Sequence, residues 1–307
     1  MKQTLVIGST VADVILSVPR LPGTGEDINI TAQTQRLGGC AFNVAGILKL
    51  AGIPHTLCSP VGSGLYGDFV AAELEKLGMP CFVRLPDTPN GCCYCLVENS
   101  GERTFLCKHG AEYLFSREWM QNADCGRADS AYICGLEIEE ECGGEIIAFL
   151  QSRPEYTVYF APGARFLHIP QDRVQAIFDM HPVLHLNETE ALTFTAADGV
   201  PQAAEILAGK TGNAVIVTLG EKGAYCFSGG RGTLVGGYRT TVRDTIGAGD
   251  AHFGAVIAYL KRGLPLEQAT DRANRIAAAV VSVTGAALPE HLFRETEKTF
   301  HRTEDVP

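Results

Sequence analysis

Short apolar runs alternate with helical patterns along most of this 307-residue sequence. The apolar runs have the length of buried strands and lie at residues 5–8, 56–61, 131–134, 157–160, 183–185 and 214–218. Segments with helical periodicity lie at residues 41–51, 68–77, 139–151, 171–178, 201–207, 248–260 and 266–283. Alternating strands and helices predict an α/β fold, with a parallel sheet and helices on both of its faces.

Two segments interrupt the alternation, residues 12–35 and 91–107. Residues 12–35 are rich in β-branched residues, residues 91–107 are rich in Cys, and neither segment has helical periodicity. The second contains two β-type runs separated by the turn sequence at residues 99–101, which predicts a hairpin. Because both segments leave and rejoin the α/β core, we expect a small β-sheet lid on one domain spanning residues 1–307. The sequence has no low-complexity linker that would favour two independent domains.

The charged residues argue against two classes of partner. The sequence has 25 Lys and Arg against 35 Asp and Glu, a formal net charge of −10, and no cluster of cations. We expect no nucleic-acid partner and no membrane partner, because these need clustered positive charge or an apolar segment of about 20 residues. The first residues lack the apolar stretch of a signal peptide, so we expect a cytoplasmic protein. The 11 cysteines lack metal-site spacing and are expected to be reduced thiols.

A G-x-G-x-x-G pattern at residues 62–67 follows a predicted strand and precedes a predicted helix. This is the setting of the dinucleotide-binding fingerprint, and it keeps an NAD-dependent oxidoreductase open as an alternative function. The acidic residue of that fingerprint should end a second strand, whereas Asp87 lies in a segment that the sequence predicts as a turn. A tight glycine turn that lets the following helix pack closely is the simpler interpretation.

The sequence Asp-Thr-Ile-Gly-Ala-Gly-Asp at residues 244–250 lies directly before a long predicted helix. Small residues at a helix start leave backbone N–H groups exposed, and with the helix dipole these attract an anion such as a phosphate. A carboxylate at Asp250 would repel that phosphate, so its position suits a base that takes a proton from an attacking hydroxyl. An aspartate that compensates the helix dipole is the simpler alternative.

The same seven residues resemble the C-terminal signature of the ribokinase-like (PfkB) carbohydrate kinases. Residues 38–43 supply the G-G-x-x-x-N pattern of the second signature, and the remaining features agree in order along essentially the whole chain. The resemblance implies a Rossmann-like (ribokinase-like) three-layer core with a central, mostly parallel sheet and a small β-sheet lid. It also implies ATP-dependent phosphorylation of a hydroxyl on a sugar or sugar-like substrate, with ATP and Mg²⁺ as cofactors.

The resemblance assigns roles to the residues that match the family's motifs. Asp250 would be the general base, and the anion hole for the transferred phosphoryl group would be formed by Gly247, Ala248 and Gly249. The sugar hydroxyls would be held by Asp13, Gly39, Asn43 and Glu137. The nucleotide would be bound by Asn187, Thr218, Gly220, Gly223 and Asn274, and Mg²⁺ would be organised by Glu190.

Some positions depart from the family's pattern. His252 stands where the family usually has Phe, and Gly64 where a G-x-D-x-x-G turn has Asp. Residues 283–287 form a shorter segment than the ribokinase loop that completes a monovalent-cation site, which argues against activation by K⁺. Family members often dimerise through the lid, and the apolar hairpin at residues 92–106 predicts a homodimer of that kind.

Three alternatives stay open. Within the family, the acceptor would be a nucleoside of the pseudouridine or adenosine type and not a free sugar. From another class, the chain would be the NAD-dependent oxidoreductase considered above. A catalytically silent sensor of sugar or nucleotide is the third alternative, and the intact Asp250 argues against it.

Overall fold

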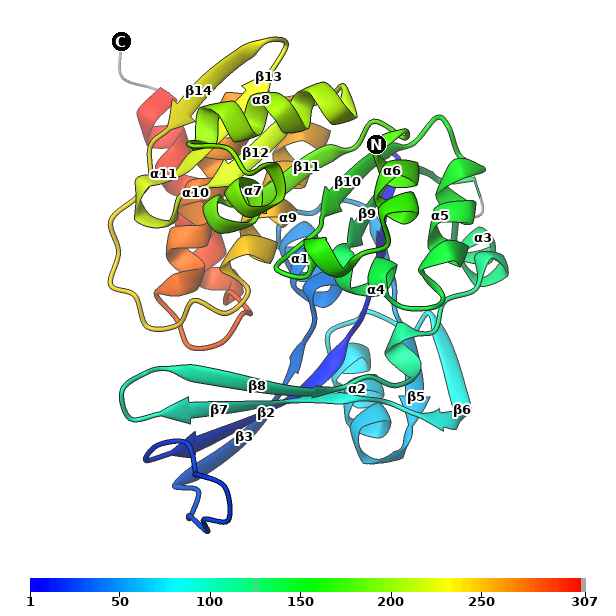
Figure 1. The fold of residues 1–307 in the computed structure, drawn as a ribbon, viewed down its shortest axis with the longest axis vertical. Coiled ribbons are helices and arrows are strands. Elements are labelled where there is room, and N and C mark those ends of the chain that lie inside the picture. The colour runs from blue at the N-terminus through cyan, green and yellow to red at the C-terminus, as the bar shows by residue number, and fades with distance from the viewer. Residues whose placement is uncertain (125, 305–307) are drawn as a thin grey trace.

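An eight-stranded sheet runs through the centre of the molecule in the order β14-β13-β12-β11-β10-β9-β1-β4 (Figure 1). The computed structural model describes residues 1–124 and 126–304, and the side chains of residues 1–124 and 126–299. Neighbouring strands are parallel except at β12–β13 and β13–β14. The strands are β1 (Gln3–Ile7), β4 (His55–Cys58), β9 (Ala128–Cys134), β10 (Thr157–Ala161), β11 (Val183–Asn187), β12 (Val215–Thr218), β13 (Ala224–Ser228) and β14 (Arg231–Val235).

Helices cover both faces of this sheet, because successive strand residues point to opposite sides. On β1, Val6 belongs to one hydrophobic cluster, whereas Leu5 and Ile7 belong to the other. The first cluster is covered by α1 (Cys40–Leu50), α2 (Gly64–Lys76), α9 (Ala248–Lys261), α10 (Leu266–Val281) and α11 (Glu290–Glu304). The second is covered by α3 (Arg117–Asp124), α4 (Gly135–Glu139), α5 (Gly143–Gln151), α6 (Gln171–Phe178), α7 (Glu188–Thr195) and α8 (Val200–Thr211). The predicted three-layer α/β core is confirmed.

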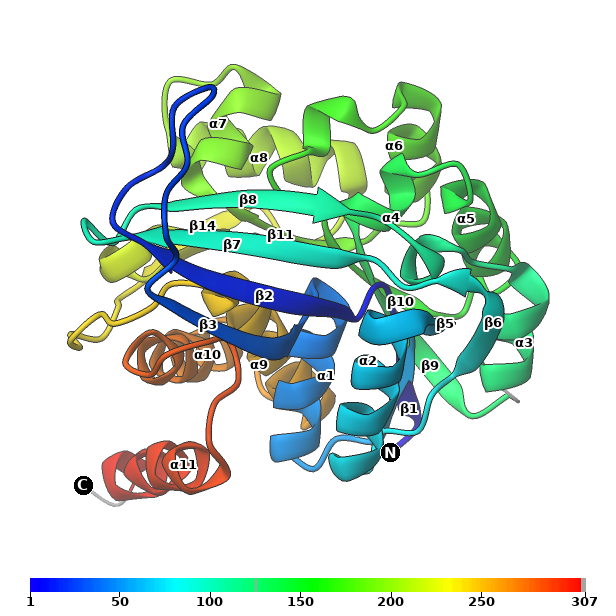
Figure 2. The ribbon, with the colours of Figure 1, turned by 90° about the horizontal axis from the view of Figure 1, so that it is seen from below.

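A second sheet has the order β3-β2-β7-β8 and lies across one side of the molecule (Figure 2). Its strands are β2 (Val11–Val18), β3 (Ala32–Gly38), β7 (Cys92–Glu98) and β8 (Arg103–Lys108). The antiparallel pairing of β7 with β8 confirms the predicted hairpin. The interrupting segments 12–35 and 91–107 therefore supply most of this separate sheet, which we call the lid sheet. Strands β5 (Pro60–Ser63) and β6 (Val83–Pro89) form a further two-stranded sheet.

The strand order of the central sheet reverses between β1 and β9. The chain passes from β1 to β4 on one side, whereas β9, β10, β11 and β12 follow one another on the other side. At such a reversal the connections leave in opposite directions, and a crevice opens at the carboxyl ends of the strands. The topology alone therefore places a ligand site where residues 8–10 leave β1 and residues 135–137 leave β9.

Three local predictions were wrong. The helix expected at 139–151 is two helices, α4 and α5, because the Arg173 guanidinium binds the carbonyl oxygens of Ile138, Glu139 and Glu140 and ends α4 there. The strand expected at 56–61 is also divided, into β4 of the central sheet and β5, which begins at Pro60 and pairs elsewhere. Asp87 lies in strand β6 and not in a turn.

No helix within the described ranges is long and apolar enough to cross a membrane. Ten of the 11 cysteines lie in the described part of the chain, and all ten are free thiols there.

Candidate active site

The first turn of α9 combines exposed backbone donors with a carboxylate. Gly247 caps the helix with a φ of +71°, and a Cβ at this position would lie 2.4 Å from the Cβ of Ala286. Only glycine fits this backbone and this close approach. The N–H groups that follow lie at the positive end of the helix, where the first four donors have no partner within the helix. The Ala248 N–H donates weakly to the Thr245 carbonyl oxygen, over 3.3 Å. Residues 247–249 therefore present backbone donors suited to an anion beside Asp250, and we call them the anion-binding turn.

Asp250 is half-buried and hydrogen-bonded to Asn43 near the start of α1. The Asn43 side-chain nitrogen donates to Asp250 Oδ2 over 2.8 Å. Burial raises the pKa of Asp250 to about 6, and the charge of Glu190 acts in the same direction. Hydrogen bonds from Asn43 and from the Cys40 thiol lower the pKa of Asp250 and so oppose this shift. The result is a carboxylate able to accept a proton near neutral pH.

The glycine pair before α1 brings the substrate-side residues together. A Cβ on Gly38 would lie 2.0 Å from Asp13 Oδ2, so the Asp13 carboxylate occupies the space that a side chain would fill. Gly39 has a φ of +105°, and its Cβ would lie 2.4 Å from the Ser9 carbonyl oxygen. The next residue, Cys40, reaches Asp250. Residues 38, 39 and 40 thus contact, in turn, the lid strand β2, the residues after β1 and the start of α9.

Glu137 lies at the reversal in strand order. Its side chain is fully buried, and its Oε1 accepts a hydrogen bond of 2.8 Å from the Ser9 backbone N–H. Burial raises the pKa of Glu137 to about 7, and burial likewise raises the pKa of Asp13 to about 6. Two further polar atoms here, Thr10 Oγ1 and Asn43 Oδ1, are buried without a partner among the described residues. Such atoms are rare in folded proteins, so this cluster of polar groups is suited to the hydroxyl groups of a ligand.

Asn187 and Glu190 form a capping box at the start of α7. The Glu190 N–H donates to Asn187 Oδ1 over 2.8 Å, and the Asn187 N–H donates to Glu190 Oε2 over 3.0 Å. This reciprocal pair satisfies two backbone donors of the helix start. Burial raises the pKa of Glu190, and one of its oxygens is outside the pair.

Thr218, Gly220 and Gly223 lie beside that helix start. Thr218 ends β12 directly opposite Asn187 of β11, so both residues lie at the same edge of the sheet. Gly220 and Gly223 have φ angles of +61° and +96° in the turn to β13, which suits glycine. A Cβ on Gly223 would lie 2.1 Å from the Val235 carbonyl oxygen. This edge therefore offers tight backbone turns close to α7.

Asn274 is buried, 6% exposed, and its amide group is bonded within the protein. Its Nδ2 donates to the carbonyl oxygens of Val235 and Gly236, over 3.1 and 3.0 Å. Its Oδ1 therefore faces His252 Nε2, which must carry a proton, over 2.9 Å. His252 Nδ1 then accepts from His185 Nε2, also over 2.9 Å. Burial lowers the pKa of both histidines, that of His252 to about 4, so the chain of side chains is neutral.

The structure brings most of the predicted site residues to one edge of the central sheet. Asp13, Gly39, Asn43, Glu137 and Asp250 converge at the strand-order reversal, and Asn187, Glu190, Thr218, Gly220 and Gly223 lie at the ends of β11 and β12. Asn274 instead binds the carbonyl oxygens at the end of β14, those of Val235 and Gly236. The sequence interpretation missed the contact of Cys40 with Asp250 and the pairing of His185 with His252; the unusual polar residue at position 252 was the only signal.

Residues 1–291 match the sequence model of the pfkB family carbohydrate kinases. The chain belongs to this family. It is 33% identical over 290 residues to the uncharacterized sugar kinase YegV of Escherichia coli (strain K12), covering 92% of this chain and 90% of that protein.

Solved structures of ribokinases share the fold of this pfkB-family enzyme. The ribokinase of Thermotoga maritima superposes with a TM-score of 0.84 at 24% identity, covering 97% of this chain and 100% of the other. The ribokinase of Arabidopsis thaliana, complexed with ribose and ATP, has a TM-score of 0.80 at 22% identity and covers 97% and 99%. These likenesses extend over essentially the whole length of each protein.

Family membership decides against the NAD-dependent oxidoreductase, and the glycines at residues 62–67 have a packing role. The Gly62 N–H donates to Asn90 Oδ1 over 2.9 Å. A Cβ on Gly62 would lie 2.4 Å from the Thr88 carbonyl oxygen, and one on Gly67 would lie 2.0 Å from the Gly62 carbonyl oxygen. These glycines let the β5–α2 turn pack closely against β6.

Proposed function

We propose that this pfkB-family kinase transfers the γ-phosphoryl group of ATP to a hydroxyl of a sugar or sugar-like substrate, with Asp250 as general base. One observation carries the proposal: the Asp250 carboxylate, whose pKa is raised to about 6, lies directly after the anion-binding turn at residues 247–249. The ribokinase of Arabidopsis thaliana, which shares the fold, is complexed with ribose and ATP, and this supports the choice of ligands.

The geometry divides the chemistry between Asp250 and the backbone. The carboxylate of Asp250 accepts the proton of the attacking hydroxyl, while the N–H groups at Gly247, Ala248 and Gly249 stabilise charge on the transferred group. Phosphoryl transfer depends mostly on positioning and on charge stabilisation, and fixed backbone dipoles supply both. The protein's net charge of −10 does not oppose ATP binding at this turn, because these local donors are not part of the formal charge.

The sugar is bound between the lid sheet and the central sheet. Asp13, on strand β2, and Glu137 supply carboxylate acceptors, while Gly39 and Asn43 line the start of α1. Sugars present several hydroxyls that both donate and accept, so acidic and amide side chains suit them. The buried and unpartnered Asn43 Oδ1 and Thr10 Oγ1 support a polyol ligand in particular.

The nucleotide is bound along the ends of β11 and β12, by Asn187, Thr218, Gly220 and Gly223. Within the described residues no group of three or more His, Cys, Asp or Glu side chains forms a metal site, so Mg²⁺ is not held by a protein cage. The half-buried Glu190, with one oxygen outside its capping box, fits the single carboxylate that Mg²⁺ uses beside water and phosphates. When bound, Mg²⁺ neutralises phosphate charge. Asn274 supports this site indirectly by holding the backbone at residues 235–236.

The lid sheet supports two further parts of the proposal. Residues 1–307 form one catalytic domain, with the segments 12–35 and 91–107 as its lid. Strand β8 lies at an edge of the lid sheet, and two of its apolar side chains, Phe105 and Leu106, are 51% and 59% exposed. An exposed apolar edge strand favours pairing with a second chain, so we infer a homodimer formed through the lids, in the cytoplasm.

A panel of pentoses, hexoses and nucleosides, assayed by ADP release from ATP with Mg²⁺, tests the function. We expect ADP release with at least one sugar, and release at least about 100-fold slower with Asp250→Asn. ADP release with nucleosides alone would show that the acceptor is a nucleoside and not a free sugar. If NADH fluorescence titration shows binding while no ATP binding is detected, the kinase proposal is wrong.

A further inference from the structure

Asp244 joins the two loops that flank the anion-binding turn. Its carboxyl group is 4% exposed, its Oδ1 accepts from the Ile246 N–H, and its Oδ2 accepts from the Gly285 N–H, each over 2.8 Å. The residue after Gly285, Ala286, packs against Gly247. The position of Gly247 therefore depends on the Asp244 carboxylate.

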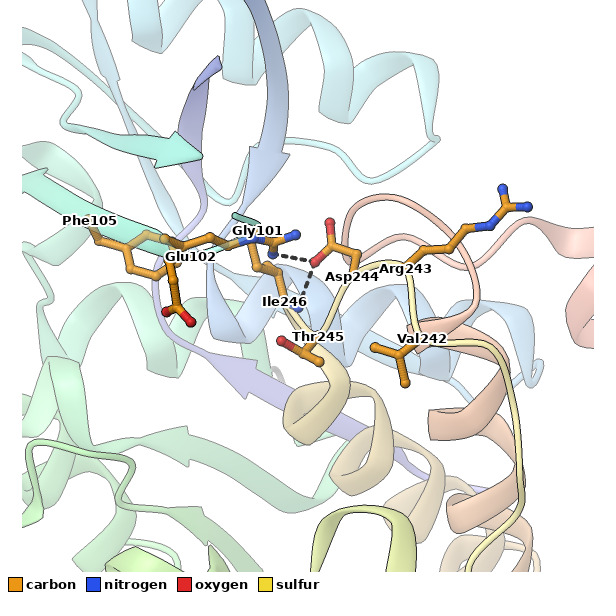
Figure 3. Close-up of a pocket in the computed structure, with 9 residues that line it drawn as sticks. Gly101, Glu102, Phe105, Val242, Arg243, Asp244, Thr245 and Ile246 are labelled. Atoms are coloured by element: carbon orange, nitrogen blue, oxygen red, sulfur yellow. Dashed lines mark hydrogen bonds and ion pairs between the residues drawn. The ribbon is translucent and has the colours of Figure 1, made fainter. Parts of the chain in front are cut away.

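The partner of this carboxylate comes from the lid sheet. The Arg103 guanidinium, at the start of β8, donates to Asp244 Oδ1 (Figure 3). Burial alone would raise the pKa of Asp244, but Arg103 and the two backbone N–H groups hold it below its ordinary value. The carboxylate is therefore ionised, and loss of the partly exposed Arg103 would leave a buried charge unpaired, which destabilises a protein.

A second lid arginine binds the neighbouring loop. The Arg36 guanidinium, on β3, donates to the Thr284 carbonyl oxygen over 2.7 Å. Two strands of the lid sheet thus each send one arginine to the loops beside the anion-binding turn. The contacts join segments that are far apart in the sequence, so they form only when the lid sheet lies over the site.

These contacts bear on the monovalent cation that the family resemblance implies. A cation at these loops would need oxygen ligands, and the available ones include the Asp244 carboxylate and the Thr284 carbonyl. Here each of them faces a guanidinium, and a K⁺ ion beside Arg103 and Arg36 would meet like charge. The residues present do not fit a bound K⁺.

We propose that Arg103 is a positioning residue for phosphoryl transfer. Its guanidinium, which comes from the lid sheet, supplies to Asp244 the positive charge that a bound K⁺ would otherwise supply. The anion hole is then fully organised only when the lid is closed, which confines transfer to the substrate-bound state. This inference rests on the proposed kinase function.

The surroundings of the pair allow a chemical test. A cavity of about 490 Å³ lies against Arg103 and Asp244 and is lined also by Glu102, Phe105 and Thr245 (Figure 3). Shortening the Arg103 side chain would open this cavity to Asp244, so a small cation from solution can take the place of the guanidinium.

The experiment compares the wild type with Arg103→Ala in buffers that hold K⁺, guanidinium or tetramethylammonium at equal ionic strength. We expect the wild-type kcat to be the same in all three. We expect Arg103→Ala to lower kcat about 10- to 100-fold in tetramethylammonium, and K⁺ or guanidinium to restore part of the loss. Arg243→Ala is the matched control. Arg243 is a cation of the same loop, but its side chain points away from Asp244, so the kcat of this variant should not respond to K⁺.

Two results would overturn the inference: activation of the wild type by K⁺, or a loss in Arg103→Ala that neither cation restores. If Arg103→Ala fails to fold, Arg103→Lys replaces it. A Lys variant as active as the wild type would show that a positive charge beside Asp244 is enough to organise the anion hole. Absence of ADP release by the wild type with every sugar and nucleoside would instead contradict the proposed function, so the two failures are distinguishable.

Discussion

The Asn43 side-chain amide donates to Asp250 Oδ2 over 2.8 Å, across 207 positions of sequence. The two residues lie in the first turns of α1 and α9, helices that begin at the same edge of the central sheet. The hydrogen bond stabilises the ionised carboxylate and so lowers the pKa of Asp250 against the effect of burial. The pKa of Asp250, the proposed base, therefore depends on Asn43, which is also one of the residues proposed to bind the sugar.

Asn43→Ala should move the acidic limb of the pH profile of kcat/KM to higher pH. Without the donated hydrogen bond, the pKa of Asp250 rises above its present value of about 6. The base is then protonated over a wider range, so activity falls further at pH 6 than at pH 8. Because a sugar contact is also lost, the quantity to measure is the ratio of kcat/KM at the two pH values, normalised to the wild type. An unchanged ratio would contradict the role of Asn43 in setting this pKa.

Asp250→Asn should lower kcat by at least about 100-fold while ATP still binds, because the amide cannot accept the proton of the attacking hydroxyl. Steady-state ADP release gives kcat, and equilibrium titration gives the ATP affinity. Asp172→Asn is the matched control, since Asp172 lies in the first turn of α6, exposed and far from the site residues. Near-normal turnover of Asp250→Asn would rule out the general base.

The sequence predicted those parts of the site that depend on local patterns. The small residues at 247–249 predicted a helix start beside Asp250, because such a start has the same chemistry wherever it occurs. Asn43, which hydrogen-bonds to Asp250, was predicted through the family resemblance. Helix α6 was predicted with its observed bounds, since its periodic pattern is local and complete.

Features that depend on distant contacts were not predictable from the sequence. The end of α4 at Glu139 is imposed by Arg173 from another helix, which no periodicity reveals. Strand β14 was missed because it lies at the edge of the sheet and has a weak apolar pattern. Strand β13, AYCFS, was missed although most of its residues are apolar. The contact of Arg103 with Asp244 spans 141 positions and crosses from the lid to the core, so it appears only once the two are placed together.

Glu137→Gln should stabilise the protein at alkaline pH. The pKa of Glu137 is raised from the ordinary value of 4.5 to about 7 by burial. The contribution of Glu137 to the free energy of unfolding is therefore greatest below pH 4.5 and is lost as the pH rises to about 7. Above that pH, folding must bury an ionised carboxylate, which costs roughly 3 kcal/mol. Glutamine keeps an acceptor for the Ser9 N–H without that charge.

Thermal unfolding measured between pH 5 and pH 8 tests this prediction. The gain in Tm of Glu137→Gln over the wild type should be larger at pH 8 than at pH 5, while sugar affinity falls. Glu139→Gln is the control: hydrogen bonding to Arg165 lowers the pKa of Glu139, so its replacement should bring no gain at pH 8. A gain in Tm that is independent of pH would show that Glu137 is not buried as a titrating acid.

Substitutions at two glycines of the anion-binding turn should affect Tm and kcat differently. Gly249→Ala has room, because nothing lies within 4 Å of a Cβ there. We expect Tm to stay within a few degrees of the wild type and kcat to fall about tenfold or more, since the methyl group would occupy the approach of the phosphate. Gly144→Ala, also the second residue of a helix with open space around its Cβ, should leave both quantities unchanged.

Gly247→Ala should instead lower Tm as well as kcat. Its φ of +71° costs an L-residue about 1–2 kcal/mol, and its Cβ would lie 2.4 Å from that of Ala286, which must shift. The shift would also disturb the Gly285 N–H that binds Asp244. If Gly249→Ala retained wild-type turnover while Gly247→Ala lost it only in proportion to its loss of folded protein, residues 247–249 would be a structural turn and not an anion hole.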